Sequence, residues 1–327
     1  AAISAVALDS PEIVRAEGGG MLLAPNMKFG CAFQQPGQDT LFVVGLESGG
    51  QDAPELGSVT LWMFSPLAGF DTTPRVTWRL AGTPVQALPL EGGRIAVLCR
   101  GSLGVSLVMF DTRTRQLLAD MLLSPVGDPA QGPASPIEMA ITPDKRRVLV
   151  LVSGFSLESP EGEQRSWLYQ LDAATFEFIA EPEEFPGIPQ TPAPSLWPLA
   201  NGACWMATIS PGEGFAYLYR LPLTPSAPRA VEQPFVNALG PLRVAPDPAG
   251  TAVAIGVRER LEIWPEGEPA GTPTHFENSL SFVEWCEFGI LAAEAHRLHL
   301  VNPEDGAILQ TAAFQSGVVA EALMLAA

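Results

Sequence analysis

The chain has 327 residues, of which 47% are hydrophobic and 17% are charged, and this is the composition of a folded globular protein. Its 36 acidic residues against 18 Lys and Arg give a formal net charge of −18. This charge argues against nucleic-acid partners and anionic membrane surfaces, because binding to both depends on basic side chains. No stretch approaches the roughly twenty apolar residues of a membrane span.

The four cysteines indicate neither a disulfide framework nor a metal site. Cys31, Cys99, Cys204 and Cys286 each fall within a different expected strand, and none belongs to a CxxC pair. We interpret them as small buried hydrophobic residues. No signal peptide is recognisable, but a chain that begins at Ala1 could have lost a leader, so cytoplasmic and periplasmic locations both stay open.

Taken in order, the chain predicts strands in repeated groups. Residues 3–8 and 11–16 resemble the last two strands of a four-stranded group, and residues 318–326 resemble a first strand. Six fuller groups lie between these ends, at residues 28–82, 83–123, 136–185, 194–235, 240–276 and 279–314. Repeats of about 40 to 60 residues are typical of stacked four-stranded sheets, because one such sheet is too small to bury its own faces.

The group at 136–185 shows the pattern most clearly. Four strands are expected in it, at residues 137–142, 147–152, 166–171 and 176–181. The first ends at Pro143 and Asp144, a pair that favours a turn. The second is β-branched and aliphatic without a break, as in a strand buried on both faces, and the last two alternate between large and polar side chains.

A recurring acidic turn marks the outer half of these groups. An Asp or Asn closes one strand, and an apolar strand begins a few residues later, because the side-chain oxygen can bond the backbone ahead. The turn occurs at Asp9, Asp111, Asp172 and Asn302.

The motifs A/S-x-x-P-D-x-x-R/G-x-V/L-x-V and V/L-D-x-x-T-x-x-[VIL] together resemble the seven-bladed β-propellers of the YVTN and quinoprotein-like class, which are relatives of the WD-repeat propellers. The resemblance covers nearly the whole chain. It implies one all-β domain over residues 1–327, with seven four-stranded blades and a ring closed by N- and C-terminal strands that share a blade. Six blades with free ends is the alternative. The motifs are structural, and the chain has no WD dipeptide, GH start or Asp-box, so the resemblance implies no catalytic residue.

A metal site is one reading of the inner strands. Aligned inner turns place five residues at one equivalent position, namely Cys31, Gln86, Glu138, Ser195 and Pro241. Glu284 and Glu321 lie near this position in two further groups. Because inner strands line the channel of a propeller, Glu138, Glu284 and Glu321 could converge on calcium or another divalent cation, which would resemble the metal-dependent lactonase propellers. The alternative is that they are hydrated channel-lining groups, since only one of the five aligned residues is acidic.

Other candidate chemistry is sparse. The chain has no GxSxG, HExxH, GxxxxGK[ST] or GxGxxG motif of the catalytic and nucleotide-binding classes. His296 and His299 are three apart on an expected strand and so face opposite sides, which disfavours a shared metal. With His275, we interpret them as solvated or hydrogen-bonded histidines. The tryptophans read as core, although Trp197 and Trp285 on inner strands are candidates for a quinoprotein-like cofactor face.

Three long polar connections, at residues 47–58, 154–165 and 181–194, are the remaining candidates for function, since loops on a rigid scaffold often present binding residues. The sequence therefore predicts a non-catalytic propeller that acts as a protein-interaction or scaffold subunit without a cofactor. Its protein partner would be basic if the acidic loops bind it. The alternative is a lactonase-like or quinoprotein-like enzyme with a metal or cofactor site at the channel mouth.

Overall fold

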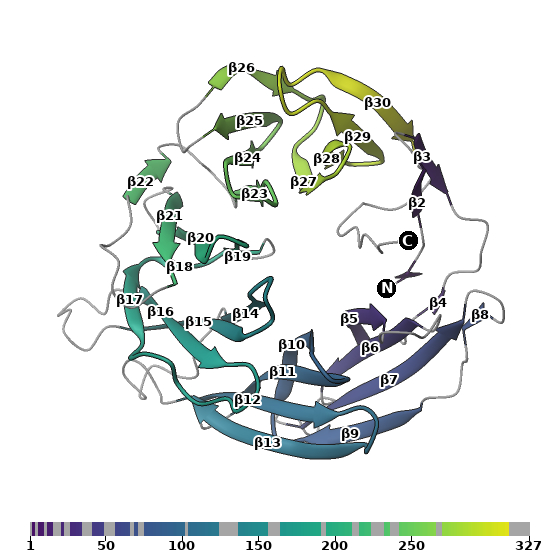
Figure 1. Cartoon of the computed structure of the whole chain (residues 1–327), viewed down its shortest axis with the longest axis vertical. Helices are drawn as coiled ribbons and strands as arrows, with labels where there is room; N and C mark the ends of the chain where they lie inside the picture. The colour runs from purple at the N-terminus through teal and green to yellow at the C-terminus, as the bar shows by residue number, and fades with distance from the viewer. Residues whose placement is uncertain are drawn as a thin grey trace. The chain divides into compact units, whose positions relative to one another are not determined.

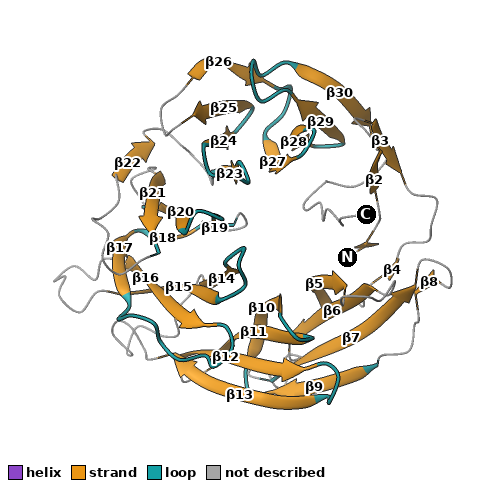
Figure 2. Ribbon diagram, viewed as in Figure 1, coloured by secondary structure: helices purple, strands orange, loops and turns teal. Residues whose placement is uncertain are grey.

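The structure is a computed structural model in which every regular element among the described residues is a β-strand (Figure 2). No helix capable of crossing a membrane occurs in the part of the chain that is described. The described residues are 2–3, 6–9, 12–15, 21–22, 27–34, 41–48, 56–65, 69–70, 75–101, 104–123, 137–155, 164–190, 194–210, 216–223, 232–235, 242–265 and 270–313.

Six antiparallel sheets of four or five strands follow one another along the chain (Figure 1). Sheet I contains β5 (Met27–Gln34), β6 (Leu41–Ser48), β7 (Gly57–Ser65), β8 (Gly69–Phe70) and β9 (Val76–Leu80). Sheet II contains β10 (Thr83–Leu90), β11 (Arg94–Gly101), β12 (Gly104–Asp111) and β13 (Gln116–Leu123). Sheet III contains β14 (Ile137–Ile141), β15 (Arg147–Phe155), β16 (Gln164–Asp172) and β17 (Glu183–Pro186).

The other three sheets repeat this plan. Sheet IV contains β18 (Ile188–Pro189), β19 (Leu196–Pro198), β20 (Ala203–Ile209), β21 (Ala216–Pro222) and β22 (Glu232–Phe235). Sheet V contains β23 (Arg243–Pro246), β24 (Ala252–Val257), β25 (Arg260–Pro265) and β26 (Ala270–His275). Sheet VI contains β27 (Leu280–Cys286), β28 (Gly289–Glu294), β29 (Arg297–Val301) and β30 (Ile308–Ala313). The six predicted groups are therefore confirmed as sheets.

The N-terminal region forms two small sheets. One pairs β1 (Ala2–Ile3) with β4 (Met21–Leu22), and the other pairs β2 (Val6–Asp9) with β3 (Glu12–Arg15). The expected hairpin near Asp9 is thus present. Residues 318–326 lie outside the described residues, so the closure of a ring by the two ends and the count of seven blades stay predictions.

The chain divides into two compact units. Unit 1 contains residues 1–7 and 15–186, and unit 2 contains residues 8–14 and 187–327. Sheets I to III belong to unit 1 and sheets IV to VI to unit 2, and each unit is described by itself below. The prediction of a single domain over residues 1–327 stays a prediction.

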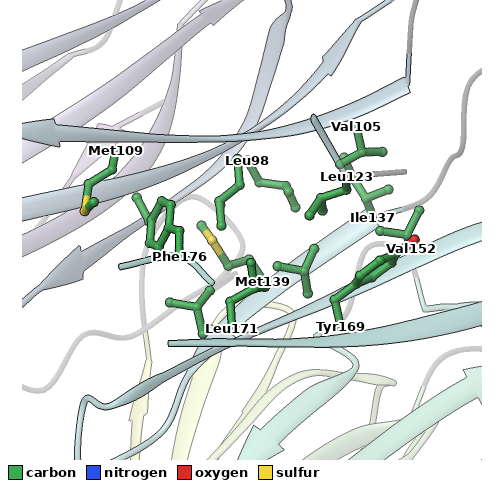
Figure 3. Close-up of a cluster of buried hydrophobic side chains, with 14 of the residues drawn as sticks. Leu98, Val105, Met109, Leu123, Ile137, Met139, Val152, Tyr169, Leu171 and Phe176 are labelled. Atoms are coloured by element: carbon green, nitrogen blue, oxygen red, sulfur yellow. The ribbon is translucent and has the colours of Figure 1, made fainter. Parts of the chain in front are cut away.

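The core of each unit lies between successive sheets, because the central strands are buried on both faces. On β11, Ile95 and Val97 join a cluster with sheet I, while Ala96 and Leu98 join a cluster with sheet III. Side chains in a strand alternate between faces, so one uninterrupted apolar run serves two interfaces. Figure 3 shows the second of these clusters, where Leu98 lies among side chains from sheets II and III.

Unit 2 is built in the same way around sheet V. Val253 and Ile255 pack with sheet IV, and Ala254 between them packs with sheet VI. All three side chains are fully buried. Fully burying an aliphatic side chain of this kind contributes about 1.5–3 kcal/mol, which is how sheets too small to be stable alone stabilise one another.

The predicted fourth strand of sheet III is wrong. Residues 176–181 do not form a strand, and β17 pairs with β16 further along the chain. The turn places Phe176 in the left-handed region, with φ of 62°, and turns its side chain into the core. Phe178 then makes a single bridge to Leu171. Pro182 follows and has no N–H to give to a ladder, so regular pairing resumes only at β17.

Candidate functional site

The structure places two of the three predicted metal ligands on first strands. Glu138 is partly buried on β14, and Glu284 is exposed on β27. They belong to different compact units, and Glu321 lies outside the described residues. Among the residues that are described, no group of three or more His, Cys, Asp and Glu side chains is arranged to hold a metal ion. A cation held by Glu138, Glu284 and Glu321 therefore stays a prediction.

Glu284 nevertheless has an unusual carboxyl group. Its side chain is exposed, yet the protein around it desolvates the carboxylate and raises its pKa to about 7. Because desolvation disfavours the charged form, part of the Glu284 population is protonated near neutral pH. A cation next to this carboxyl group would favour its charged form. A hydrogen-bond acceptor there would favour its protonated form.

The residue aligned with Glu138 in sheet II joins two sheets. Gln86 Nε2 donates to the Met139 carbonyl oxygen at 2.8 Å, and Gln86 Oε1 accepts from the Met139 N–H at 2.6 Å. Both backbone groups of Met139 point to the same side of β14, away from β15. The Gln86 amide thus occupies the position that a peptide group of a neighbouring strand would take, and we name this contact an amide clip.

A second amide clip occurs in unit 2. Gln190 Nε2 donates to the Leu242 carbonyl oxygen at 3.3 Å, and Gln190 Oε1 accepts from the Leu242 N–H at 2.5 Å. Ser195 supports it, because its Oγ accepts from the Gln190 N–H at 2.6 Å. Sequence reasoning missed Gln190, which it placed in a connecting loop. The available signal was that Ser195 aligns with Gln86 and that a glutamine lies five residues before it.

The remaining aligned and reactive candidates are core residues. Burial raises the pKa of the Cys31 thiol to about 12, which makes it a poor nucleophile and metal ligand. All four cysteines are buried, as predicted. Trp197 and Trp285 pack against the hydrophobic clusters of unit 2. Pro241 and the central parts of the first two long connections, residues 49–55 and 156–163, lie outside the described residues. The third, at residues 181–194, was wrongly predicted as a plain connection, because it contains β17 and β18.

The histidines have the roles that the sequence predicted. His275 ends β26 and is exposed, and His296 is exposed in the turn after β28. His299 is buried on β29, where Nδ1 lies 2.8 Å from Thr311 Oγ1 and Nε2 lies 3.2 Å from Glu294 Oε1. His299 and His296 therefore share no site.

The acidic turns that the sequence singled out have one geometry in three sheets. We name residues 111–116, 172–177 and 302–307 the outer turns. Asp111 Oδ1 accepts from two backbone N–H groups of its turn, and Asp172 Oδ1 does the same. The hydrogen bond from the Thr114 N–H is the main cause of the lowered pKa of Asp111. The hydrogen bond from the Thr175 N–H is likewise the main cause of the lowered pKa of Asp172.

Each outer turn has a left-handed residue at its fifth position. The φ angles there are 61° at Arg115, 62° at Phe176 and 72° at Gly306. The preceding sheet holds two of these carbonyl groups at the same place. Trp78 Nε1 donates to the Arg115 carbonyl oxygen at 3.1 Å, and Thr274 Oγ1 donates to the Gly306 carbonyl oxygen at 2.6 Å. The outer turns of sheets II and VI are therefore each tied to the preceding sheet by a side-chain hydrogen bond.

Bulky apolar residues are exposed where the chain leaves these turns. Leu117 pairs with Phe110, Phe178 with Leu171 and Ile308 with Val301. In sheets II and VI the next residue is bulged and unpaired across the ladder. Six of the eight exposed large hydrophobic residues in the described chain lie at outer edges, namely Leu117, Leu118, Leu122, Phe178, Ile308 and Leu309, and each is 43–56% exposed. Exposed apolar residues scattered singly are normal, so the recurrence of exposure at equivalent positions is the feature that needs an explanation.

The last strand of sheet II, β13, carries three of these exposed residues. We name Leu117, Leu118 and Leu122 the outer-edge leucines. They lie on β13, which has no strand beyond it in sheet II. The bulge at Leu118 interrupts the ladder, which is a common way to prevent an edge strand from pairing indiscriminately. A partner would therefore meet leucine side chains here rather than a regular row of backbone groups.

Comparison with known proteins gives a likeness of fold. No protein-family model matches the chain, and no curated protein matches it. The Dos1 propeller is 10% identical, with 84% of this chain and 64% of that chain covered at a TM-score of 0.50. The periplasmic gluconolactonase PpgL of Pseudomonas aeruginosa is 15% identical, with 86% and 85% covered and a TM-score of 0.53. BBS1N, solved in complex with ARL6DN, is 10% identical, with 88% and 82% covered and a TM-score of 0.54.

The chain has a β-propeller fold. Its repeated antiparallel sheets and its likeness to these structures agree on this point. One of the three similar structures is an enzyme by its description and another is held in a protein complex. Propellers support unrelated functions, so the fold alone does not distinguish an enzyme from a protein-interaction subunit. That distinction depends on the residues of this propeller.

Proposed function

We propose that this propeller is a protein-interaction or scaffold subunit and that the outer-edge leucines contact its partner. The observation that carries the proposal is the recurrence of exposed, bulky apolar residues after equivalent outer turns in sheets II, III and VI. A single exposed leucine needs no explanation, whereas repeated exposure at one structural position does.

The outer-edge leucines can supply useful binding energy. Each is about half exposed in the free protein. Fully burying a leucine contributes about 1.5–3 kcal/mol, so burying the exposed half of each contributes about 1 kcal/mol. Three such side chains contribute about 3 kcal/mol, which corresponds to roughly a hundredfold in affinity. This supports a contact in which the leucines are the centre of a larger interface.

Substitution of Leu118 by Asp tests the proposal. The side chain is bulged and exposed, so the variant should keep the fold while it places a charge in the contact. The matched control is Val85→Asp, since Val85 is also exposed at a bulge of sheet II but lies on its first strand, away from the outer edge. Wild type and both variants are used as bait in extracts of the native cell, and bound proteins are quantified by mass spectrometry.

The proposal predicts a protein that is retained by wild type and Val85→Asp and lost by Leu118→Asp. With that protein purified, the dissociation constant should rise at least tenfold for Leu118→Asp and stay within twofold for Val85→Asp. Equal binding by both variants would show that the outer-edge leucines are not the contact.

The salt dependence of binding separates the leucines from the acidic connections. The net charge of −18 supports the further proposal that the partner is basic. A contact made by acidic groups weakens steeply with ionic strength, because the Debye length falls from about 10 Å at 0.1 M to about 3 Å at 1 M salt. Burial of leucine side chains should instead be nearly insensitive to salt.

A metal-dependent enzyme is the second candidate, and Glu284 favours it. A carboxyl group whose pKa is raised to about 7 by desolvation is a group that a bound cation would stabilise in its charged form. Metal analysis of the purified protein and melting curves with calcium and with EDTA test this candidate. Bound calcium and a chelator-sensitive melting temperature would favour the enzyme over the scaffold.

A further inference from the structure

The guanidinium group of Arg243 is only partly satisfied by the protein. Its Nε and Nη1 atoms are buried, and neither has a hydrogen-bond partner in the structure as described. Buried polar groups are normally hydrogen-bonded, and a buried charge needs a partner most of all. The residue as a whole is only partly buried, so part of its side chain is open to solvent.

The backbone at Arg243 is fixed by the second amide clip. Arg243 begins β23, the first strand of sheet V, and it pairs with Gly256 on β24. Leu242, just before it, gives both its N–H and its C=O to the side chain of Gln190. Leu242 packs into the cluster with sheet IV, and neighbouring residues of a strand point to opposite faces. Arg243 therefore projects toward sheet VI.

A missing side chain at Gly256 makes room for the stem of Arg243. A Cβ atom at Gly256 would lie 3.1 Å from Arg243 Cβ, 3.0 Å from Val283 Cγ2 and 3.1 Å from Leu280 Cδ1. Val283 and Leu280 belong to β27 of sheet VI, in the same compact unit. The aliphatic part of Arg243 is thus enclosed between two sheets, which limits the directions in which its guanidinium can point.

Three acids of sheets V and VI are engaged with other groups. In sheets V and VI, Glu262 pairs with Arg260 at 2.8 Å, and Glu277 pairs with Arg297 at 2.7 Å. Glu294 is held by the Asn278 N–H and by His299. Desolvation lowers the pKa of Arg243, and no carboxylate contributes to that shift. Glu284, on the neighbouring β27, has a pKa shift that comes from desolvation alone. In a chain with a net charge of −18, Arg243 therefore has no carboxylate partner among the described residues.

We propose that Arg243 anchors a binding site for a small oxyanion, a phosphate or carboxylate group, at the first strand of sheet V. The planar fork of a guanidinium fits two oxygen atoms of such a group, and charge-assisted bonds of this kind are stronger than neutral ones. Arg258 follows Gly256 by two residues, just beyond the same end of β24, and it is exposed.

The test compares wild type with Arg243→Met, which removes the charge and keeps most of the stem. Arg220→Met is the matched control, because Arg220 is an exposed arginine on β21 in the same compact unit. Thermal unfolding is measured with increasing inorganic phosphate, with acetate and with chloride at equal ionic strength. Without phosphate or acetate, Arg243→Met should melt at or above the wild-type temperature, because a poorly solvated charge has been removed.

Phosphate or acetate should then stabilise wild type and Arg220→Met in a saturable manner and leave Arg243→Met unchanged. Titration calorimetry with the effective anion should show a loss of affinity of at least tenfold in Arg243→Met. If only phosphate stabilises the protein in a saturable manner, the ligand class is phosphate; if only acetate does, the ligand class is carboxylate. Equal stabilisation of all three proteins, or no saturable effect beyond chloride, would overturn the site.

A second measurement avoids any dependence on folding of the variant. The Nε–H resonance of Arg243 in wild type, assigned by its absence from Arg243→Lys, should shift during the titration and approach a plateau. A resonance that does not move while others do would also overturn the proposal.

Discussion

Loss of the first amide clip gives the sharpest test of how these sheets are joined. Gln86→Met keeps the length of the side chain and removes both hydrogen bonds to Met139, which are 2.6 and 2.8 Å long. Met139 is 1% exposed, so water cannot readily replace the lost partner. Each buried backbone group left without a partner costs about 1–3 kcal/mol. The variant should therefore lose about 3 kcal/mol of unfolding free energy.

This loss is a large part of the stability of a typical domain, which is about 5–15 kcal/mol. Urea unfolding followed by tryptophan fluorescence measures it, and hydrogen exchange of the Met139 amide reports on the clip itself. Gln116→Met is the control, because Gln116 is exposed on β13 in the same sheet. Gln86→Glu should fall between wild type and Gln86→Met, since a carboxylate can accept from the Met139 N–H but cannot donate to its carbonyl oxygen.

The reasoning would be refuted by a Gln86→Met protein within about 0.5 kcal/mol of the control together with unchanged protection of the Met139 amide. That result would mean that β14 is held by its pairing with β15 and by side-chain packing alone. Faster exchange at Met139 without global destabilisation would instead place the clip in a locally opening region.

Two further predictions concern titratable groups in sheet VI. The folded pKa of Glu284 is about 7, above its ordinary value of 4.5, so its contribution to stability is fully present below pH 4.5 and is lost as the pH rises through 7. Glu284→Gln should therefore gain melting temperature relative to wild type between pH 4.5 and 8, and a constant difference across that range would contradict the shift. Burial alone would raise the pKa of Glu294, but bonds from the Asn278 N–H and His299 outweigh it and lower the pKa. Its contribution is present above its unfolded pKa and is lost as the pH falls through the folded value, so Glu294→Gln should cost about 1–3 kcal/mol at pH 7 in urea unfolding and less in acid. An undiminished cost in acid would show that packing, rather than the charge, is what matters at Glu294.

Much of the fold could be predicted from local sequence because local chemistry specifies it. The unbroken aliphatic run on β15 required burial on both faces, and the alternation on β16 required a strand. Asp111, Asp172 and Asn302 close turns by bonding the backbone just ahead, which depends on few distant contacts. The prediction of a fourth strand at residues 176–181 was wrong because distant residues determine the structure there. Phe176 packs into a core that is made largely by residues far away in the sequence.

The amide clips and the Arg243 site depend on contacts between residues far apart in the sequence, which no short sequence pattern predicts. Gln86 and Met139 are 53 residues apart, and Gln190 and Leu242 are 52 residues apart. That Arg243 lacks a partner is visible only once Gly256, Leu280 and Val283 surround its stem. The sequence by itself determined that this protein is built from repeated strands and acidic turns, because periodicity and turn chemistry act within a few residues. Tertiary structure alone decided which side chains join the sheets and which apolar and charged groups stay available, because burial is set by residues far apart in the chain.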